Sequence, residues 1–455
     1  MRLLVCLEIA IILACCSLAS ARTWYVKPDG TGDVPSIKAA VDSAAAEGDT
    51  VLLANGTFAG AANRQVDCGD KALTIISEAS DPDLCIIDCG GAEPADVLSA
   101  FYFRASGHPS PRLEAVTIIH ACQAVYCDAG SSPQIVNCIF RDNHCAGAEI
   151  PPPGAGIFCF EGSSPVIRNC EFAGNESGGG ICGWRSFPVV ENCNFSGNGN
   201  CAGGAIEAWG GLLTVTGCTF SGNLAADFMC GNCGGGALMC VGSADVANCT
   251  FTDNRSYMGP GGAIFFRPDS AFAHLTVAGC TFVGNQVLQG LDVGVGVAAS
   301  SNKASSITIT NCTFAGNSTD VSRDGGTLSI DGGGDVNATV ENTIISFARK
   351  GGAVHLLGTP TVSLKCCDIF GNTGGDWTGP IAGQNGINGN LSADPLFCDR
   401  GSDDLSLENC SPCLPGHHPA GYDCGEMIGA RGVGCECNAA AVPTTWGAIK
   451  ALFKD

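Results

Sequence analysis

Segment 137–143, with the sequence NCIFRDN, is the first copy of a phrase that recurs along this chain. Close copies follow at 169–175 (NCEFAGN), 192–198 (NCNFSGN), 217–223 (GCTFSGN), 248–254 (NCTFTDN), 279–285 (GCTFVGN) and 311–317 (NCTFAGN), and a weaker one, CDIFGN, at 367–372. A Gly-rich start recurs upstream of the later copies, at 178–181, 203–206, 235–238, 261–264 and 351–354. The chain is therefore built from repeats of one unit.

The length of the unit predicts the architecture. Successive cysteines of the phrase are 23 to 32 residues apart. The shortest unit holds three short strands and three bends, which make one coil of a solenoid, and longer units add a loop at one bend. Helical repeats would place apolar residues at i, i+3 and i+4, whereas this chain alternates around Gly and β-branched residues. The period therefore indicates a parallel β-helix.

The phrase also predicts which side chains face the interior. In 135–140, we expect Ile135, Cys138 and Phe140 to point inward and Asn137 to occupy a bend. Asn tolerates the left-handed conformation of such a bend, and its amide is expected to bond to the equivalent Asn one coil away. Cys and Phe would form interior ladders spaced by about 4.8 Å. An inward Cys is a small apolar side chain, so most ladder cysteines are predicted to be packing residues.

The G-G-A-I … N-C-x-F-x-x-N unit resembles the right-handed β-helix repeats of bacterial secreted and surface proteins in the pectin-lyase-like superfamily, and is similar to those of polymorphic outer-membrane proteins. Segments 29–33, 49–53 and 56–58 resemble the entry to such helices, where an amphipathic stretch like 36–46 caps the first coil. Segments 394–397, 411–413 and 428–430 resemble the closing part. The resemblance, over about 22–437, implies the fold. It leaves function open, because such folds host lyases, hydrolases, esterases, adhesins and passive surface proteins.

The expected organisation is all-β: a single right-handed parallel β-helix with a short N-terminal helical cap and a Cys-rich C-terminal cap. We divide the chain into a signal peptide (1–21), N-terminal cap and first coil (22–60), repeats (61–393), Cys-rich cap (394–437), and linker with a short tail (438–455). Trp446, Ile449 and Phe453 are spaced i, i+3 and i+7, which predicts one apolar face of a short helix in that tail. It is either a sorting or docking tag or a loosely packed end.

The composition and net charge limit the classes of partner that this chain can bind. The 455 residues include 64 Gly and 30 Cys, with 15% charged and 7% aromatic residues, which suits many short strands and tight turns. The net charge of −22 argues against nucleic acid and anionic membranes, whose binding requires clustered Lys and Arg. We therefore expect no nucleic-acid partner.

The first segment predicts export. Arg2 precedes an apolar run that is interrupted by Glu8 and followed by an A-x-A-like site at 19–21. A lipoprotein signal ending at Cys15 is the alternative. No later stretch is long and apolar enough to span a membrane, so the mature protein is expected to be secreted or on the cell surface, without a transmembrane segment. Disulfides are expected there, and the odd number of cysteines left after signal removal requires one that is unpaired or bridges chains.

Disulfide candidates lie in the cap and in one loop: Cys398, Cys410, Cys413, Cys424, Cys435, Cys437, Cys230 and Cys233. Zinc at Cys410 and Cys413 with His417 and His418 is the alternative for the cap, but the second half of a zinc ribbon is missing. We therefore expect no metal there.

Sugar cleavage would require paired carboxylates, or acids beside an Arg, on the outer face of one sheet. The repeat strands show no convincing example, so the catalytic residues are unknown. Asp403 and Asp404 belong to the cap, and the stretch from Asp331 to Asp335 is interpreted as a turn, with a Ca²⁺ site as its alternative. No other cofactor is expected.

An outward stripe is the candidate binding surface. If the strands after the Gly-rich starts alternate, one outward column holds Phe160, Trp184, Trp209 and Arg267, beside a second column that includes Glu207. Such an apolar outer face is either a ligand site or covered by the long loops. The ligand-binding candidates are Phe160, Trp184, Glu207, Trp209 and Arg267, with aromatic rings for sugar faces and charged groups for directional hydrogen bonds.

These observations predict a non-catalytic protein that binds a polysaccharide or a cell-envelope partner. A polysaccharide lyase or glycoside hydrolase is one alternative, and a structural surface stalk or adhesin is the other.

Overall fold

The computed structural model describes residues 21–437 except 46, 92–98, 105–109, 129, 145–155, 227–233, 290–293, 320–324 and 334. The predicted signal peptide (apart from its last residue), Cys230, Cys233 and the C-terminal tail therefore lie outside the described residues. No helix in the described part is long and apolar enough to cross a membrane.

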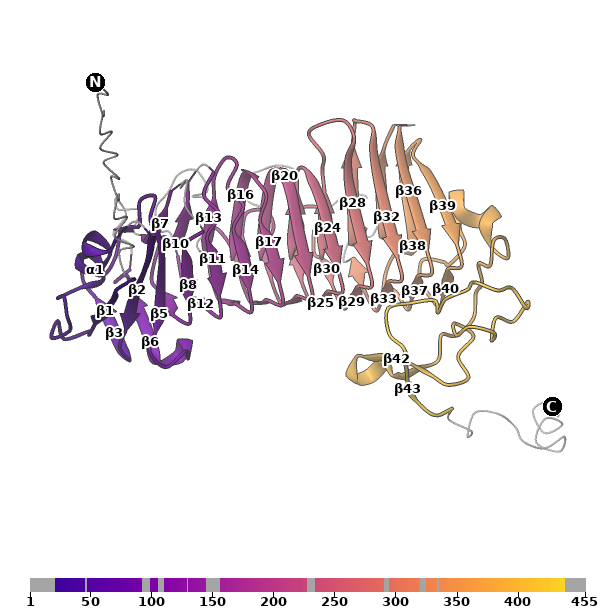
Figure 1. Cartoon of the computed structure of the whole chain (residues 1–455). Helices are drawn as coiled ribbons and strands as arrows, with labels where there is room; N and C mark the ends of the chain where they lie inside the picture. The colour runs from indigo at the N-terminus through magenta and orange to yellow at the C-terminus, as the bar shows by residue number, and fades with distance from the viewer. Residues whose placement is uncertain are drawn as a thin grey trace, which may run out of the picture.

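Three parallel sheets run the length of the molecule, and each coil contributes one strand to each sheet. Figure 1 shows the strands stacked along one axis, from the indigo end with α1 to the orange last coils. We call the sheets A, B and C. Sheets A and C are joined because β20 continues from one into the other. This architecture confirms the predicted parallel β-helix with three strands per coil.

Sheet A contains β1 (Thr23–Val26), β2 (Glu47–Leu53), β5 (Ala72–Ser77), β8 (Arg112–Glu114), β11 (Gln134–Val136), β14 (Val166–Arg168), β17 (Val189–Glu191), β20 (Ile206–Thr216), β24 (Ser243–Ala247), β28 (Ala273–Ala278), β32 (Ser305–Thr310), β36 (Val336–Glu341) and β39 (Thr361–Lys365). Sheet B contains β3 (Gly56–Ala59), β6 (Cys85–Asp88), β9 (Thr117–Ile119), β12 (Ile139–Arg141), β15 (Glu171–Ala173), β18 (Asn194–Ser196), β21 (Thr219–Ser221), β25 (Thr250–Thr252), β29 (Thr281–Val283), β33 (Thr313–Ala315), β37 (Ile344–Ser346) and β40 (Asp368–Phe370). Sheet C contains β4 (Val66–Asp67), β7 (Ser99–Phe103), β10 (Gln123–Cys127), β13 (Ile157–Cys159), β16 (Ile181–Ser186), β20, β23 (Leu238–Cys240), β27 (Ile264–Phe266), β31 (Gly294–Ser301), β35 (Gly326–Gly332) and β38 (Gly352–Gly358).

Shorter elements complete the fold. A narrow sheet follows the bend after sheet B, with β19 (Gly199–Asn200), β22 (Leu224–Ala225), β26 (Arg255–Ser256), β30 (Gln286–Val287) and β34 (Ser318–Thr319). The cap has β41 (Phe397–Asp399), β42 (Asp404–Glu408) and β43 (Val433–Cys435). The helices are α1 (Ile37–Ser43) and the 3₁₀ turns η1 (Pro82–Leu84), η2 (Gly379–Gln384) and η3 (Arg400–Ser402).

Identical side chains stack along the interior. The buried phenylalanines of the repeat lie in register with ring centroids 4.4 to 4.9 Å apart: Phe140, Phe172, Phe195, Phe220, Phe251, Phe282 and Phe314. The ladder cysteines are also buried, and the Sγ of Cys170 accepts a hydrogen bond from the backbone N–H of Cys138 one coil earlier (3.5 Å). The inward positions were thus predicted from the phrase alone.

The amide ladder differs in position from the prediction. Asn137 does adopt the left-handed bend, with φ 51°. Its amide, however, donates to the carbonyl of Ser80, so the predicted ladder at this position is wrong. The ladder is formed by the last Asn of each phrase, as where Nδ2 of Asn198 donates to Oδ1 of Asn223 (3.0 Å). Asn137 sits at a solvent-facing bend, whereas the last Asn is fully buried, where its polar atoms need protein partners.

The ends of the helix are closed differently. Helix α1 starts at the N-cap Ser36, whose Oγ accepts a hydrogen bond from the N–H of Ala39, and it buries Ile37 and Val41. At the other end the yellow segment of Figure 1 folds back beside the last strands of sheet B. There the backbone N–H of Ala430 donates to Oγ1 of Thr313, and Arg431 reaches Thr250 and Thr281. Both predicted caps are present.

Candidate functional site

The candidate site is a cleft where sheet C bends into sheet A, with a volume of about 580 Å³. Its lining residues come from five successive coils: Trp209, Val241, Arg267, Pro268, Asp269, Ser300, Ser301, Asn302, Lys303, Asp331, Gly332 and Gly333. We call it the outer cleft. Neighbouring parallel strands lie about 4.8 Å apart, so five coils span about 19 Å along the axis.

Trp209 forms one end of the cleft and is held in place by its neighbours. It lies on β20, in register with Trp184 of β16, and the two rings stack with centroids 6.0 Å apart and an interplanar angle of 27°. Trp184 is 41% exposed, whereas Trp209 is half-buried. The sequence thus predicted correctly that these two rings are neighbours on successive coils.

The carboxylate of Glu207 orients Trp209. Its Oε1 accepts a hydrogen bond from Nε1 of Trp209 (2.6 Å) and its Oε2 accepts one from Nδ2 of Asn200 (2.7 Å). Burial raises the pKa of Glu207, and these two hydrogen bonds partly counteract that shift. Each carboxylate oxygen thus already accepts one hydrogen bond inside the protein, and the role of Glu207 as a hydrogen-bonding partner for a ligand stays a prediction.

The aromatic row is shorter than predicted. Phe160 follows the end of β13 and is half-buried, and its ring contact is with Phe158, at 6.1 Å. Among the described residues no ring contact joins Phe160 to Trp184, so the predicted row that begins at Phe160 is not formed. The backbone stays in register past Cys159, since the N–H of Gly162 donates to the carbonyl of Arg185 (2.8 Å), but the ring of Phe160 packs on Phe158.

The second outward column is covered. Phe158, Cys182, Met239 and Phe265 are in register with Glu207, as the alternation predicted, but each is less than 10% exposed. Met239 and Phe265 pack with Ala202, from the segment that follows β19. The apolar surface open to solvent is thus limited to the Trp184–Trp209 stack and its continuation into the outer cleft.

Charged side chains of both signs line the rest of the outer cleft. Arg267 and Asp269 come from the turn after β27, Lys303 from the turn after β31, and Asp331 from β35. Oγ of Ser300 lies 3.4 Å from Oδ2 of Asp331. Stacking of coils brings Arg267, Lys303 and Asp331, up to 64 positions apart, into one cleft. Among the described residues no ion pair joins Arg267 to an acid, so the expectation about acids beside an Arg stays a prediction.

Asp331 is on a strand and not in the predicted turn. Strand β35 extends to Gly332, and Asp335 follows in the turn. A Cβ on Gly332 would lie 2.8 Å from the carbonyl oxygen of Ser301, so Gly allows the coils beneath the cleft to pack closely. Among the described residues, Asp331 and Asp335 do not gather with a third metal-ligating side chain. Ca²⁺ also binds backbone carbonyls, and Gly334 between them lies outside the described residues, so the alternative Ca²⁺ site stays a prediction.

In the cap the structure pairs most of the candidate cysteines. Disulfides join Cys398 to Cys435, Cys410 to Cys437, and Cys424 to Cys366 of the last coil. The prediction that Cys413 forms a disulfide is wrong. Cys413 is a buried thiol, and its Sγ lies 3.2 Å from Oδ2 of the buried Asp368.

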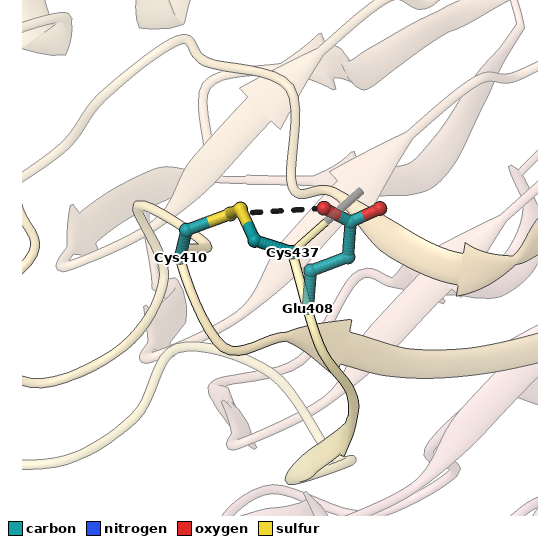
Figure 2. Close-up of side chains that lie close together, drawn as sticks. All are labelled: Glu408, Cys410 and Cys437. Carbon is teal, nitrogen blue, oxygen red and sulfur yellow. Dashed lines mark hydrogen bonds between the residues drawn. A yellow bond between two sulfur atoms is a disulfide. The ribbon is translucent and has the colours of Figure 1, made fainter. Parts of the chain in front are cut away.

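One group in the described part has three potential metal-ligating atoms close together, namely Glu408, Cys410 and Cys437. Figure 2 shows that the two sulfurs are bonded to each other, with the carboxylate directed at them. A disulfide supplies no thiolate ligand, and His417 and His418 contact the carbonyls of Ser411 and Gly389 instead. The arrangement therefore fits a structural disulfide.

The comparisons with known proteins bear on the fold. The family described as right handed beta helix region matches residues 123–314, and no curated protein matches the sequence. Among solved structures, the crystal structure of pectate lyase Pel9A is 10% identical with a TM-score of 0.36, over 91% of this chain and 96% of that chain. That similarity is too low to support an inference about ligand or reaction. The family match and the strand pairing confirm the predicted right-handed parallel β-helix.

Proposed function

We propose that this right-handed parallel β-helix binds a carbohydrate chain along the outer cleft. The observation that carries the proposal is the Trp184–Trp209 stack leading into a cleft of about 580 Å³ lined by charged and hydroxyl side chains. Sugar rings have apolar C–H faces that pack on indole rings, and their hydroxyls require hydrogen-bond donors and acceptors. The outer cleft has both kinds of surface.

The coil repeat suits an extended polymer. The spacing of neighbouring coils, about 4.8 Å, is close to the length of one pyranose residue in an extended chain. Equivalent side chains therefore recur in step with successive sugars, from Trp209 through Arg267 and Ser300 to Asp331. The mixed charge of the cleft favours a neutral or weakly charged polysaccharide over a polyuronate, which the net charge of −22 repels at low salt. The protein is proposed to act at the cell surface or as a secreted protein.

A polysaccharide lyase or glycoside hydrolase is the second candidate. It is favoured by Arg267, Asp269, Lys303 and Asp331 lining one cleft, since both reactions need carboxylates or cations beside the scissile bond. The exposed side chains of Asp269 and Asp331 favour binding over catalysis, because acid–base chemistry is strengthened where water is excluded.

Binding and cleavage are separated by one set of assays. The purified mature chain is screened against a glycan array, and hits are titrated by calorimetry while reducing ends and unsaturated products are followed. Trp209→Ala is expected to weaken binding by about 1–3 kcal/mol. The matched control is Leu84→Ala, which truncates an exposed apolar side chain far from Trp209 in the sequence. It should bind like the parent protein.

Release of products that is lost in Arg267→Gln or Asp331→Asn would replace the binding proposal with the enzyme. Equal affinity of the parent and Trp209→Ala would show that the outer cleft is not the carbohydrate site. Failure of every glycan to bind would contradict the proposal. The alternative of a structural surface stalk would then be favoured.

A further inference from the structure

A second cavity lies between the C-terminal cap and the last coils of the helix, with a volume of about 340 Å³. Its lining residues are Val283, Ala315, Gly316, Phe347, Ala348, Arg349, Gly371, Thr373, Arg400, Asp403 and Leu405. We call it the cap cleft. It lies outside the outer cleft and is not used by the proposed function.

Two arginines from different parts of the chain line the cap cleft. Arg349 follows β37 of the helix, and Arg400 begins η3 of the cap. Neither guanidinium is joined to a carboxylate by an ion pair within the described residues, although Asp403 also lines the cavity. Among the side chains that line the cavity, two guanidiniums therefore stand against one carboxylate, in a chain whose net charge is −22.

The position of Phe347 is unusual and holds Arg400 in place. It has φ 55° at a bend where other coils have Gly or Asp, such as Gly316 and Asp253. A left-handed conformation is rare for a bulky residue, and such outliers gather at functional sites. The guanidinium of Arg400 lies 3.8 Å from the centroid of the Phe347 ring, so it is stacked against that face.

The next coil makes room for that ring. A Cβ on Gly371 would lie 2.9 Å from Cδ1 of Phe347. The opposite wall is apolar, because Val283 and Ala315 pack with Leu405 of the cap. The cap cleft thus combines an apolar wall with the Arg400 guanidinium stacked on Phe347 and the exposed side chain of Arg349.

From this arrangement we infer that the cap cleft binds a small oxyanion-bearing ligand, with its carboxylate or sulfate group between Arg349 and Arg400. A guanidinium presents a planar fork of N–H donors that matches such groups with two parallel hydrogen bonds. One arginine belongs to the helix and the other to the cap, so the ligand bridges the two and stabilises cap docking. The apolar wall accommodates the carbon skeleton.

The test uses titration calorimetry and thermal unfolding of the full mature chain at constant ionic strength. The probes are sodium sulfate, sodium acetate and glucuronate, with chloride as the reference. Saturable binding is expected, together with a rise in the unfolding temperature that follows probe concentration. Arg349→Gln is expected to weaken binding by about tenfold or more, the loss of roughly one charge-assisted hydrogen bond.

The matched control is Arg255→Gln, which removes the same charge from the exposed surface of β26 and should change affinity by less than about twofold. Arg349→Lys keeps the charge but not the fork, and should bind more weakly than the parent. An unfolding temperature of Arg349→Gln equal to that of the parent without probe shows that the variant is folded.

The probes distinguish the two sources of the oxyanion. Tighter binding of glucuronate than of acetate supports a sugar acid, and tighter binding of sulfate supports a sulfated ligand. The inference is overturned if no probe binds saturably, or if folded Arg349→Gln binds like the parent. Trp209→Ala should leave this binding unchanged, so failure here and failure of the outer cleft are separate results.

Discussion

Two carboxyl groups, those of Glu207 and Asp368, hold neighbouring parts of this protein together. Glu207 uses both carboxylate oxygens to orient Trp209. Asp368 takes the position that Ile344 has one coil earlier in sheet B, and there it is fully buried. Its Oδ1 accepts a hydrogen bond from the N–H of Ala393 (3.0 Å), and its Oδ2 lies beside Cys413. One carboxyl thus joins the last coil to the cap.

The protonation of Asp368 predicts a pH dependence of stability. Burial raises its pKa to about 7, with further contributions from Asp394 and Asp376. In the unfolded chain it is about 3.9. The protonated carboxyl therefore favours folding fully below about pH 4, and this contribution is lost as the pH rises to about 7, by up to about 1.4 kcal/mol per pH unit.

Asp368→Asn should remove that slope, so its unfolding free energy should fall less than that of the parent between pH 4 and 7. Denaturant unfolding followed by fluorescence at each pH measures the difference. The control is Asp83→Asn, which changes an exposed carboxylate in η1. Parallel pH profiles of Asp368→Asn and the parent would contradict the assignment.

At the level of elements, the coils are held in register by ladders of identical side chains. From Asn143 to Asn285, each Asn of the ladder donates to the next Asn and to a backbone carbonyl, as Asn223 does to Asn254 (2.9 Å) and to Phe195 (3.0 Å). Asn223 also provides a hydrogen-bond acceptor for the backbone of the previous coil, because its Oδ1 accepts from the backbone N–H of Asn198 (3.0 Å). The Phe and Cys ladders both pack in the interior of the helix.

Loss of one rung should cost several hydrogen bonds at once. Asn223→Ala leaves the carbonyl of Phe195 and the N–H of Asn198 buried without partners, and we expect a loss of about 3 kcal/mol or more in unfolding free energy. Urea unfolding followed by circular dichroism measures it. Asn194→Ala, at an exposed position of the preceding coil, should cost less than about 1 kcal/mol. Similar losses in both variants would refute the role of the ladder.

The ladder thiols are expected to be unreactive in the folded protein. Cys170, Cys193, Cys249 and Cys312 are buried, and burial raises the pKa of Cys170 well above its ordinary value. Alkylation requires the thiolate and access, so iodoacetamide at pH 8 should leave these four unmodified until the chain unfolds. Mass mapping before and after denaturation without reductant tests this, and early labelling or mixed disulfides among them would be inconsistent with the packing.

Across the whole molecule, the main junction is that between the β-helix and its C-terminal cap. Cys366 of the last coil is bonded to Cys424 of the cap, and Nδ2 of Asn311 donates to Oε2 of Glu426. Arg431 adds contacts along sheet B to Thr250 and Thr281. The cap is thus attached along several coils of sheet B as well as at the last coil, and the cap cleft forms at this junction.

Removal of the bridging disulfide should release the cap. Replacing Cys366 and Cys424 together by Ala is expected to lower the stability of the docked cap by about 2–4 kcal/mol, because the cross-link restricts the unfolded chain. Limited proteolysis would then cut the cap at lower denaturant concentration than the coils. The pair Cys410 and Cys437, which lies within the cap, is the control and should leave docking intact. Equal release in both variants would contradict the junction.

The amino-acid pattern alone was enough for the coil: its three strands, the inward Cys and Phe, and the pairing of Trp184 with Trp209. These features depend on the period of the repeat and on the alternation along each strand, which are local properties of the sequence. Because the coils stack in register, the same side chain takes the same place in every coil. The left-handed bend at Asn137 was likewise evident from its residue type.

The contents of the sites depended on the tertiary structure. Atoms from other segments decide three of these contacts. They decide that Glu207 bonds to Asn200, that Cys413 lies beside Asp368 and not beside a second cysteine, and which Asn forms the ladder. Loop lengths differ from coil to coil, so they break the repeat and decide which outward side chains are covered. The outer cleft combines paired strand positions, such as Ser300 and Asp331, with the turns that follow them, and the cap cleft lies at the cap junction. The charged residues at these places are not part of the repeated phrase, so the period does not predict which charges meet.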